Sequence, residues 1–282
     1  MEQKWKNLIK TPSFIADHLH HFSHQNPSLL LQRIGRNGSM HLYLLDRESQ
    51  LLEFPTQFLE FQKMDDLSDA KIICSSHGLL CVEIGKYRTL HHSVLLWNPA
   101  IREIREVHRT IKDFESYYSF GFGFSPIVKD YKIVKTYAAR FHKGVKQVEV
   151  YSLSTGSWKE IELGNLERVT LLEETVTVNG VMYWVGIKLD VGGGDKDGNK
   201  VVSFDMATEV FTLMPCPAVD IDSSPAFKLT AYDNKLAVLN LPYIGTSESS
   251  SFDLWIMEEC ASHQERDGVG LRNIGASPIH SI

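Results

Sequence analysis

An aromatic residue recurs at a near-constant interval along the chain, each time inside the same pattern of strand, turn and returning strand. The pattern is clearest in residues 148–163, VEVYSLSTGSWKEIEL, where a turn at 154–157 separates two alternating segments. Five anchor residues align on it, at spacings of 54, 54, 53 and 51 residues: Tyr43, Trp97, Tyr151, Phe204 and Trp255. Short strands repeated at about this interval are typical of propeller blades, which are four-stranded sheets.

The turns inside each unit repeat as well. A turn signal precedes the anchor in four units, at Gly78, Asp130, Gly180 and Lys235. The dipeptide Asn179-Gly180 is the strongest of these signals, because both central residues of a type I′ hairpin turn need a positive φ. The sequence therefore predicts an all-β fold, in which units of about 50 residues each form a small antiparallel sheet.

The returning strand of each unit has its own pattern. Large apolar residues stand seven and ten places after the anchor in three units: Ile104 and Val107, Trp158 and Ile161, Phe211 and Met214. In the last unit Ser262 and Glu265 occupy those two places. We therefore expect the last blade to lack its returning strand and the ring of blades to be incomplete.

The two ends of the chain differ from the repeats. Thr11-Pro12 is a favourable helix start, and Ile15, Leu19 and Phe22 then fall on one helix face. The last segment has few apolar residues and no alternation, so we expect it to be disordered. The sequence predicts a helical segment at 1–25, a β-repeat domain at 28–258 and a divergent tail at 259–282.

The composition argues against several functional classes. The formal net charge of −6 gives no support for nucleic-acid binding, which uses a basic surface. The chain has no run of about 18 apolar residues, so we expect no membrane span. Four scattered cysteines without a CxxC pair, and the lack of a signal peptide, indicate a cytoplasmic or nuclear protein.

Local motifs that could carry chemistry each have a simpler explanation. His18 and His21 share a helix face, but no nearby cysteine or carboxylate pattern completes a set of four metal ligands. Gly121-x-Gly123 lacks the third glycine and the following helix of a dinucleotide site, which favours small residues placed for close packing. We therefore predict no catalytic residue, no cofactor and no metal.

The anchors have two interpretations, a series of ligand-stacking rings or packing residues between blades. One large residue per unit favours packing, since a repeat cannot bury its face alone. Recognition in repeat folds uses the loops at one rim, and the longest candidates are 108–118, 140–146, 190–200 and 242–251.

Six ordered phrases of the chain resemble the plant F-box-associated (kelch-type, S-locus-like) family: LLWNPAIREIREV, FGFGFSPIVKDYKIVK, VEVYSLSTGSWKEI, VNGVMYWVG, VVSFDMATEVFTLMP and FDLWIMEE. The opening, QKWKNLIKTPSFIADHL, is similar to the end of an F-box, with matches at Trp5, Leu8, Ile9, Pro12 and Phe14. The resemblance covers residues 3–257 and implies a kelch-like β-propeller preceded by a short helical F-box remnant. It also implies a chain that begins inside the F-box and diverges after Glu259.

The resemblance implies a non-enzymatic adaptor of an SCF-type (cullin-RING) ubiquitin ligase. In that family the F-box helices hold a Skp-type linker and thereby a cullin, and the repeat domain captures a target protein for ubiquitin-dependent degradation. Two alternatives remain open. One is a target-binding module that recruits no ligase because its F-box is incomplete. The other is an enzyme on a propeller scaffold, which would need ionisable residues that converge at a central channel.

Overall fold

The computed structural model describes residues 29–34, 40–45, 51–54, 70–86, 89–98, 103–107, 116–139, 144–188, 199–215, 226–241, 251–259 and 269–278. The chain divides into two units, Met1–Arg109 and Thr110–Ile282. Within the described residues, all regular structure is β-strand except for one 3-10 helix at Gly164–Arg168. The predicted all-β class is confirmed. The predicted helical segment, with Trp5, Leu8, Ile9, Pro12 and Phe14, lies outside the described residues.

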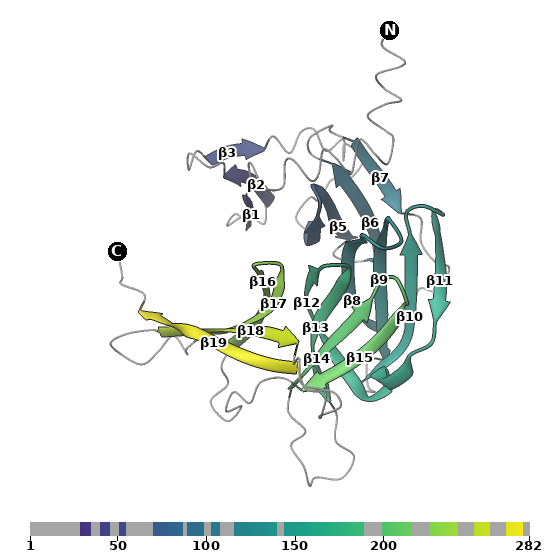
Figure 1. Ribbon diagram of the computed structural model, residues 1–282. Coiled ribbons are helices and arrows are strands. Elements are labelled where there is room, and N and C mark those ends of the chain that lie inside the picture. The colour runs from purple at the N-terminus through teal and green to yellow at the C-terminus, as the bar shows by residue number, and fades with distance from the viewer. Residues whose placement is uncertain are drawn as a thin grey trace. The chain divides into compact units, whose positions relative to one another are not determined.

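The first unit contains two antiparallel sheets (Figure 1). Sheet A has three strands: β1 (Leu29–Ile34), β2 (Met40–Leu45) and β3 (Leu51–Phe54). Sheet B has four: β4 (Ala70–Ser76), β5 (Leu79–Lys86), β6 (Thr89–Asn98) and β7 (Glu103–Val107). In both sheets each strand pairs with the next one in the chain.

The second unit contains three four-stranded sheets with the same up-and-down order. Sheet C is formed by β8 (Ser116–Ser125), β9 (Asp130–Ala139), β10 (Val145–Ser152) and β11 (Ser157–Ile161). Sheet D is formed by β12 (Val169–Val178), β13 (Val181–Lys188), β14 (Asn199–Asp205) and β15 (Val210–Pro215). Sheet E is formed by β16 (Ala226–Tyr232), β17 (Lys235–Leu241), β18 (Ser251–Glu259) and β19 (Val269–Pro278).

Strand β19 corrects the prediction for the end of the chain. The returning strand of the last unit is present at 269–278, where a disordered tail was expected, and it pairs with β18 in a register that puts Asn273 opposite Trp255. The prediction failed because it placed the strand seven residues after the anchor. Here residues 260–268 separate the two strands in the sequence, so the strand begins later than in the other sheets.

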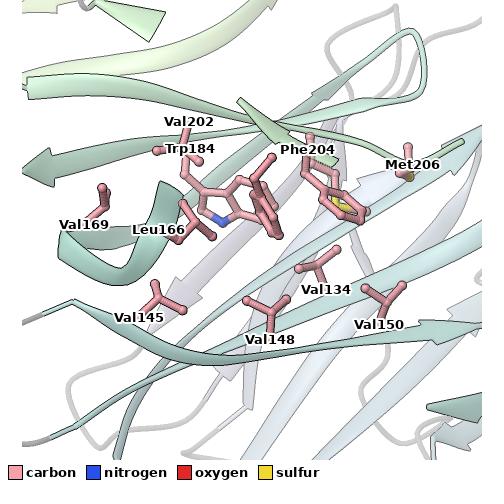
Figure 2. Close-up of a cluster of buried hydrophobic side chains, with 12 residues drawn as sticks. Val134, Val145, Val148, Val150, Leu166, Val169, Trp184, Val202, Phe204 and Met206 are labelled. Atoms are coloured by element: carbon pink, nitrogen blue, oxygen red, sulfur yellow. The ribbon is translucent and has the colours of Figure 1, made fainter. Parts of the chain in front are cut away.

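Sheets C and D pack face to face over the main core of the second unit. Four valines of sheet C lie against the aromatic rings of sheet D, with Leu166 of the 3-10 helix closing one side (Figure 2). The buried cluster consists of Val134, Val145, Val148, Val150, Leu166, Val169, Met182, Trp184, Val202, Phe204, Met206 and Phe211. At the same time β12, the first strand of sheet D, contacts the first strands of its neighbours, β8 and β16.

The close approach of sheets C and D depends on the glycines of β8. A Cβ added to Gly121 would overlap the ring of Trp184, and one added to Gly123 would overlap Thr177. Both side chains also form hydrogen bonds with the backbone of β8. Trp184 Nε1 donates to Phe120 O at 3.3 Å, and Thr177 Oγ1 donates to Phe122 O at 2.8 Å. The interpretation of Gly121-x-Gly123 as a close-packing pattern is confirmed.

Four anchors occupy the third strand of a four-stranded sheet: Trp97, Tyr151, Phe204 and Trp255. The fifth, Tyr43, lies on β2, the middle strand of sheet A. Phe204 is fully buried in the core between sheets C and D, and Phe211 lies directly opposite it with ring centroids 4.7 Å apart. Tyr151 and Trp158 form the equivalent pair in sheet C, and Trp97 and Ile104 in sheet B. Residues seven places after these three anchors are thus their cross-strand partners.

Candidate functional site

The up-and-down order places two kinds of connection at opposite ends of the sheets. In the second unit, the turns between first and second strands lie at the same end as the turns between third and fourth strands of sheets C and D. These turns are short: 126–129, 153–156, 179–180, 206–209 and 233–234. We call this end the short-turn rim. The loops predicted for recognition, 108–118, 140–146, 190–200 and 242–251, leave the strands at the other end, and most of their residues lie outside the described part of the chain.

In sheets D and E, a tight two-residue turn at the short-turn rim connects the first strand to the second. Asn179 and Gly180 have φ of 48° and 82°, and Asp233 and Asn234 have φ of 48° and 56°. Both pairs therefore form two-residue turns with a positive φ at each position, as a type I′ turn requires. The prediction for Asn179-Gly180 is confirmed. The turn at Asp233-Asn234 directly precedes Lys235, where the last unit was predicted to turn.

Contacts between neighbouring turns hold these hairpins side by side. Asn179 Nδ2 in sheet D donates a hydrogen bond to Asn234 O in sheet E at 2.9 Å. On the other side, a Cβ added to Gly180 would come within 2.9 Å of Pro126 in sheet C. The first turns of three successive sheets thus form one continuous edge.

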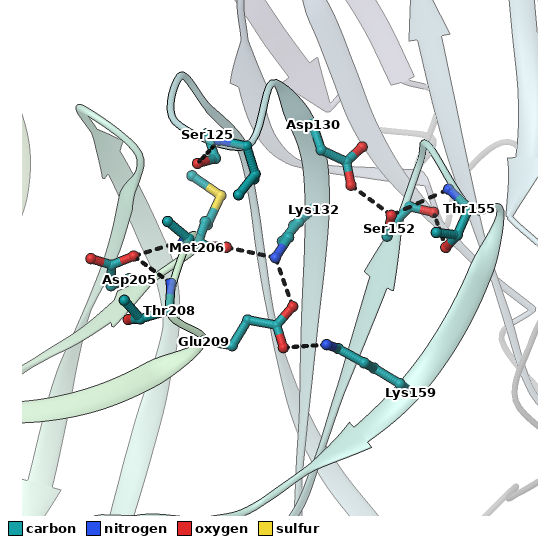
Figure 3. A network of polar contacts seen from close by, with 12 residues as sticks. Ser125, Asp130, Lys132, Ser152, Thr155, Lys159, Asp205, Met206, Thr208 and Glu209 are labelled. Atoms are coloured by element: carbon teal, nitrogen blue, oxygen red, sulfur yellow. Dashed lines mark hydrogen bonds and ion pairs between the residues drawn. The ribbon is translucent and has the colours of Figure 1, made fainter.

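A buried lysine joins sheets C and D at this rim (Figure 3). Lys132 Nζ donates to Met206 O and to Glu209 Oε1, each at 2.6 Å. The second oxygen of Glu209 pairs with Lys159 Nζ at 2.5 Å. Burial alone would raise the pKa of Glu209, but the hydrogen bonds and charges of Lys132 and Lys159 outweigh it and hold that pKa below its ordinary value.

The other polar side chains of the rim shape its turns. Asp130 accepts hydrogen bonds from Ser152 Oγ at 2.6 Å and from Ser154 N at 2.9 Å. Asp205 accepts from the backbone N–H groups of the turn that follows it, Ala207 at 2.7 Å and Thr208 at 3.0 Å. These carboxylates satisfy local donors, which is the usual role of aspartate at a turn.

Apolar side chains project from the same rim. Ile127 is 75% exposed, Val128 45%, Val210 55% and Tyr232 49%. They account for four of the six large apolar side chains that are exposed in the described part of the second unit; the others are Leu172 and Ile187. Apolar side chains gathered at an exposed edge are typical of a protein-binding surface.

These rim residues were not among those predicted from the sequence. The predicted recognition surface was the long loops, whereas Ile127 and Val128 lie in a four-residue turn between two strands. The available signal was the apolar pair itself, because an exposed turn normally carries polar residues. The contact between Lys132 and Glu209 spans 77 residues in the sequence and had no local signal.

The described residues contain neither a metal-ligand cluster nor a membrane-spanning helix. There, no group of three or more histidine, cysteine, aspartate or glutamate side chains is arranged to hold a metal ion. Nor does the described part of the chain contain a helix long and apolar enough to cross a membrane. His18 and His21 lie outside it.

Comparison with known proteins identifies the repeat domain. Residues 35–265 match the F-box associated beta propeller domain. The chain belongs to the F-box associated β-propeller family. The family confirms the predicted propeller fold. Its four-stranded up-and-down sheets in both units are the blades of this F-box associated domain.

The relatives of this F-box associated domain are plant F-box proteins. An F-box protein from Arabidopsis thaliana is 24% identical over 262 residues, which are 90% of this chain and 62% of the relative. F-box/WD-40 repeat-containing protein 1 from Arabidopsis thaliana is 24% identical over 204 residues, covering 68% of this chain and 45% of the relative. A putative F-box/kelch-repeat protein from the same plant is 21% identical and matches 90% of this chain. The chain spans roughly half to two thirds of the length of these relatives.

One solved structure, from a study of two prolyl endopeptidases, aligns with 91% of this F-box associated chain and 44% of its own. The sequence identity is 11% and the TM-score is 0.40, so the likeness supports no argument about fold or activity.

Proposed function

We propose that this protein is a substrate-recognition adaptor of an SCF-type ubiquitin ligase and has no catalytic activity of its own. The observation that carries the proposal is the match of residues 35–265 to the F-box associated domain, together with relatives that are F-box proteins. An adaptor acts by holding its target near the ligase, which raises the effective concentration of the reacting groups. The partners are a Skp-type linker, a cullin and a target protein.

We further propose that the target binds at the short-turn rim. Ile127 and Tyr232 supply exposed apolar surface, and the contacts among neighbouring turns keep that surface in one arrangement. A preorganised surface favours affinity, since less side-chain and loop freedom is lost on binding. The long loops at the other end are the competing surface, and the experiments below separate the two.

The first experiment tests ligase recruitment. The full chain and a version with a complete F-box fused before residue 28 are expressed in plant cells and precipitated with their partners. The adaptor function predicts that the fusion recovers the linker and the cullin. It also predicts a set of ubiquitinated proteins that accumulates when the proteasome is inhibited.

A matched variant decides whether that set consists of targets. Ile127→Asp combined with Tyr232→Asp, placed in the same fusion, should keep the linker and lose the ubiquitinated proteins. If the set is unchanged in the variant, the short-turn rim is not the capture surface. If neither fusion enriches any ubiquitinated protein over the F-box alone, the adaptor function is wrong.

The same precipitation distinguishes the adaptor from the alternative function, which is target binding without ligase recruitment. A chain that recovers the targets but neither the linker nor the cullin, while the fusion recovers both, is a target-binding module without ligase recruitment.

A further inference from the structure

Two cysteines face each other across the first hairpin of sheet B. Cys74 on the edge strand β4 lies directly opposite Cys81 on β5, and neither forms a disulfide. A two-residue turn joins the strands, with φ of 48° at His77 and 76° at Gly78. Pairing continues without a break from Cys74 and Cys81 to that turn, so the turn fixes which residues are opposite.

Directly opposed positions in an antiparallel pair suit a disulfide bond. Their Cα atoms lie about 4.5 or 5.5 Å apart, and their side chains point to the same face of the sheet. Disulfides span Cα separations of about 4.4–6.8 Å. A register shift lies between Ile72 and Cys74, and the pairing is regular from Cys74 and Cys81 to the turn. From this register we infer that the backbone of β4 and β5 holds the two cysteines within bonding range.

The two thiols differ in exposure. Cys74 is half-buried, whereas Cys81 is fully buried. Burial raises the pKa of Cys81 well above its ordinary value, and the charges of Cys74 and Glu83 raise it further. The thiolate is the form that reacts with oxidants, so Cys74 is the residue that a small oxidant reaches and modifies first.

We propose that Cys74 and Cys81 are a peroxide-sensitive pair that closes into a reversible disulfide between β4 and β5. In the first step the Cys74 thiolate attacks hydrogen peroxide, the O–O bond breaks, and Cys74 sulfenic acid and hydroxide form. In the second step the sulfur of Cys81 attacks the sulfenic sulfur, the S–O bond breaks, and water leaves with the Cys81 proton. The two cysteines together lose two electrons, and one peroxide is reduced. A dithiol reductant reverses the bond.

The sequence around the pair allows a direct measurement. Trypsin cleaves after Lys71 and Lys86, and the peptide between them contains both Cys74 and Cys81 and no other cysteine. The full chain is treated with hydrogen peroxide, denatured, alkylated with iodoacetamide and digested. The pair predicts that this peptide loses two hydrogens and escapes alkylation, and that dithiothreitol before alkylation restores two alkylated cysteines.

Other products would overturn the proposal. A sulfinic or sulfonic acid on Cys74 with an alkylated Cys81 would show that the thiols do not reach each other. Alkylation of both cysteines at peroxide concentrations that oxidise Cys216 or Cys260 would show that the pair is not selectively sensitive.

Two variants test the order of the steps. In Cys81→Ser, dimedone should trap the sulfenic acid on Cys74 in higher yield than in the unmodified chain. In Cys74→Ser, Cys81 should stay reduced at the same peroxide concentration. If dimedone instead traps a sulfenic acid on Cys81 in Cys74→Ser, and Cys74 stays reduced in Cys81→Ser, then Cys81 is the residue oxidised first and the proposed order is wrong. The Cys216→Ser, Cys260→Ser double variant should form the same disulfide as the unmodified chain. Because the unmodified chain gives the main result, a variant that does not fold leaves the test intact.

Discussion

Gly121 occupies a place where no side chain fits, because the ring of Trp184 from the next sheet fills the space beside its Cα. Replacement by alanine must push the Trp184 ring or β8 aside, and forced repacking of a tight core costs about 1–3 kcal/mol. We therefore expect Gly121→Ala to lower the free energy of unfolding by that amount in urea denaturation.

Thr212→Ala, at an exposed position of β15, is the control and should change the free energy of unfolding little. Equal stability of Gly121→Ala and the unmodified chain would show that sheets C and D do not approach as closely as described.

A second prediction concerns how much the ion pairs of Glu209 contribute to the stability of the fold. Its folded pKa is below its ordinary value of 4.5, so its ion pairs stabilise the fold above that value and the stabilisation is lost as the pH falls through the folded pKa. Glu209→Gln should lower the free energy of unfolding by about 1.5–3 kcal/mol at neutral pH, the range for hydrogen bonds to charged groups. The difference should shrink as the pH falls below 4.5.

Denaturation curves recorded at several pH values measure this difference. The control is Glu174→Gln, since the pair of Glu174 with Lys228 is largely exposed at a similar length of 2.8 Å. Exposed pairs contribute little, so this variant should match the unmodified chain at every pH. A loss in Glu209→Gln that does not change with pH would contradict the ionic explanation.

Strand β19 is the element whose removal tests the fold of sheet E. Deleting the chain after Glu259 removes the partner of β18 and leaves a row of backbone groups unpaired at the sheet edge. We expect faster hydrogen exchange at the β18 amides, a lower melting temperature and more aggregation, measured by mass spectrometry, calorimetry and light scattering. Deleting only residues 279–282 should leave all three unchanged. Equal exchange in the two deletions would mean that β19 does not protect β18.

Some strands and turns can be predicted from their own local sequence, and others cannot. Strands and turns of sheets B, C and D follow from local signals, since anchors such as Phe204, their partners seven residues later and the dipeptide Asn179-Gly180 recur at fixed spacing. Strand β19 has no such signal, because its distance from Trp255 departs from that spacing. The pairing of β19 comes from backbone hydrogen bonds, which any residue except proline can donate.

The candidate site likewise combines features with a local sequence signal and features that only the fold brings together. Turns were predicted at Asp130, Asn179-Gly180 and Lys235 because turn residues act locally, but the surface was not predicted. Tyr232, Ile127 and Val210 come from three different sheets, and only the stacking of those sheets brings their ends to one rim. The tie from Lys132 to Glu209 is likewise visible only in three dimensions.

For the whole molecule, the decisive test compares the two ends of the sheets. Ile127→Asp with Tyr232→Asp should weaken binding of an identified target about tenfold or more, because charges would then have to be desolvated at the centre of the interface. Ile187→Asp is the matched control: Ile187 is 40% exposed and lies near the end of β13 that is opposite the short-turn rim. Calorimetric titration measures both. If only Ile187→Asp weakens target binding, the target binds at the long loops and not at the short-turn rim.

The separation of core and rim has a consequence for how such a chain can evolve. The side chains that decide folding, such as Trp184 and Phe204, lie between sheets, whereas Ile127 in the turn at 126–129 and Tyr232 at the end of β16 are exposed and lie outside that core. Substitutions at exposed positions usually change stability by less than about 0.5 kcal/mol. A duplicated copy of this chain could therefore exchange its turn tips, and with them its preference among partners, while the scaffold that presents them stays the same.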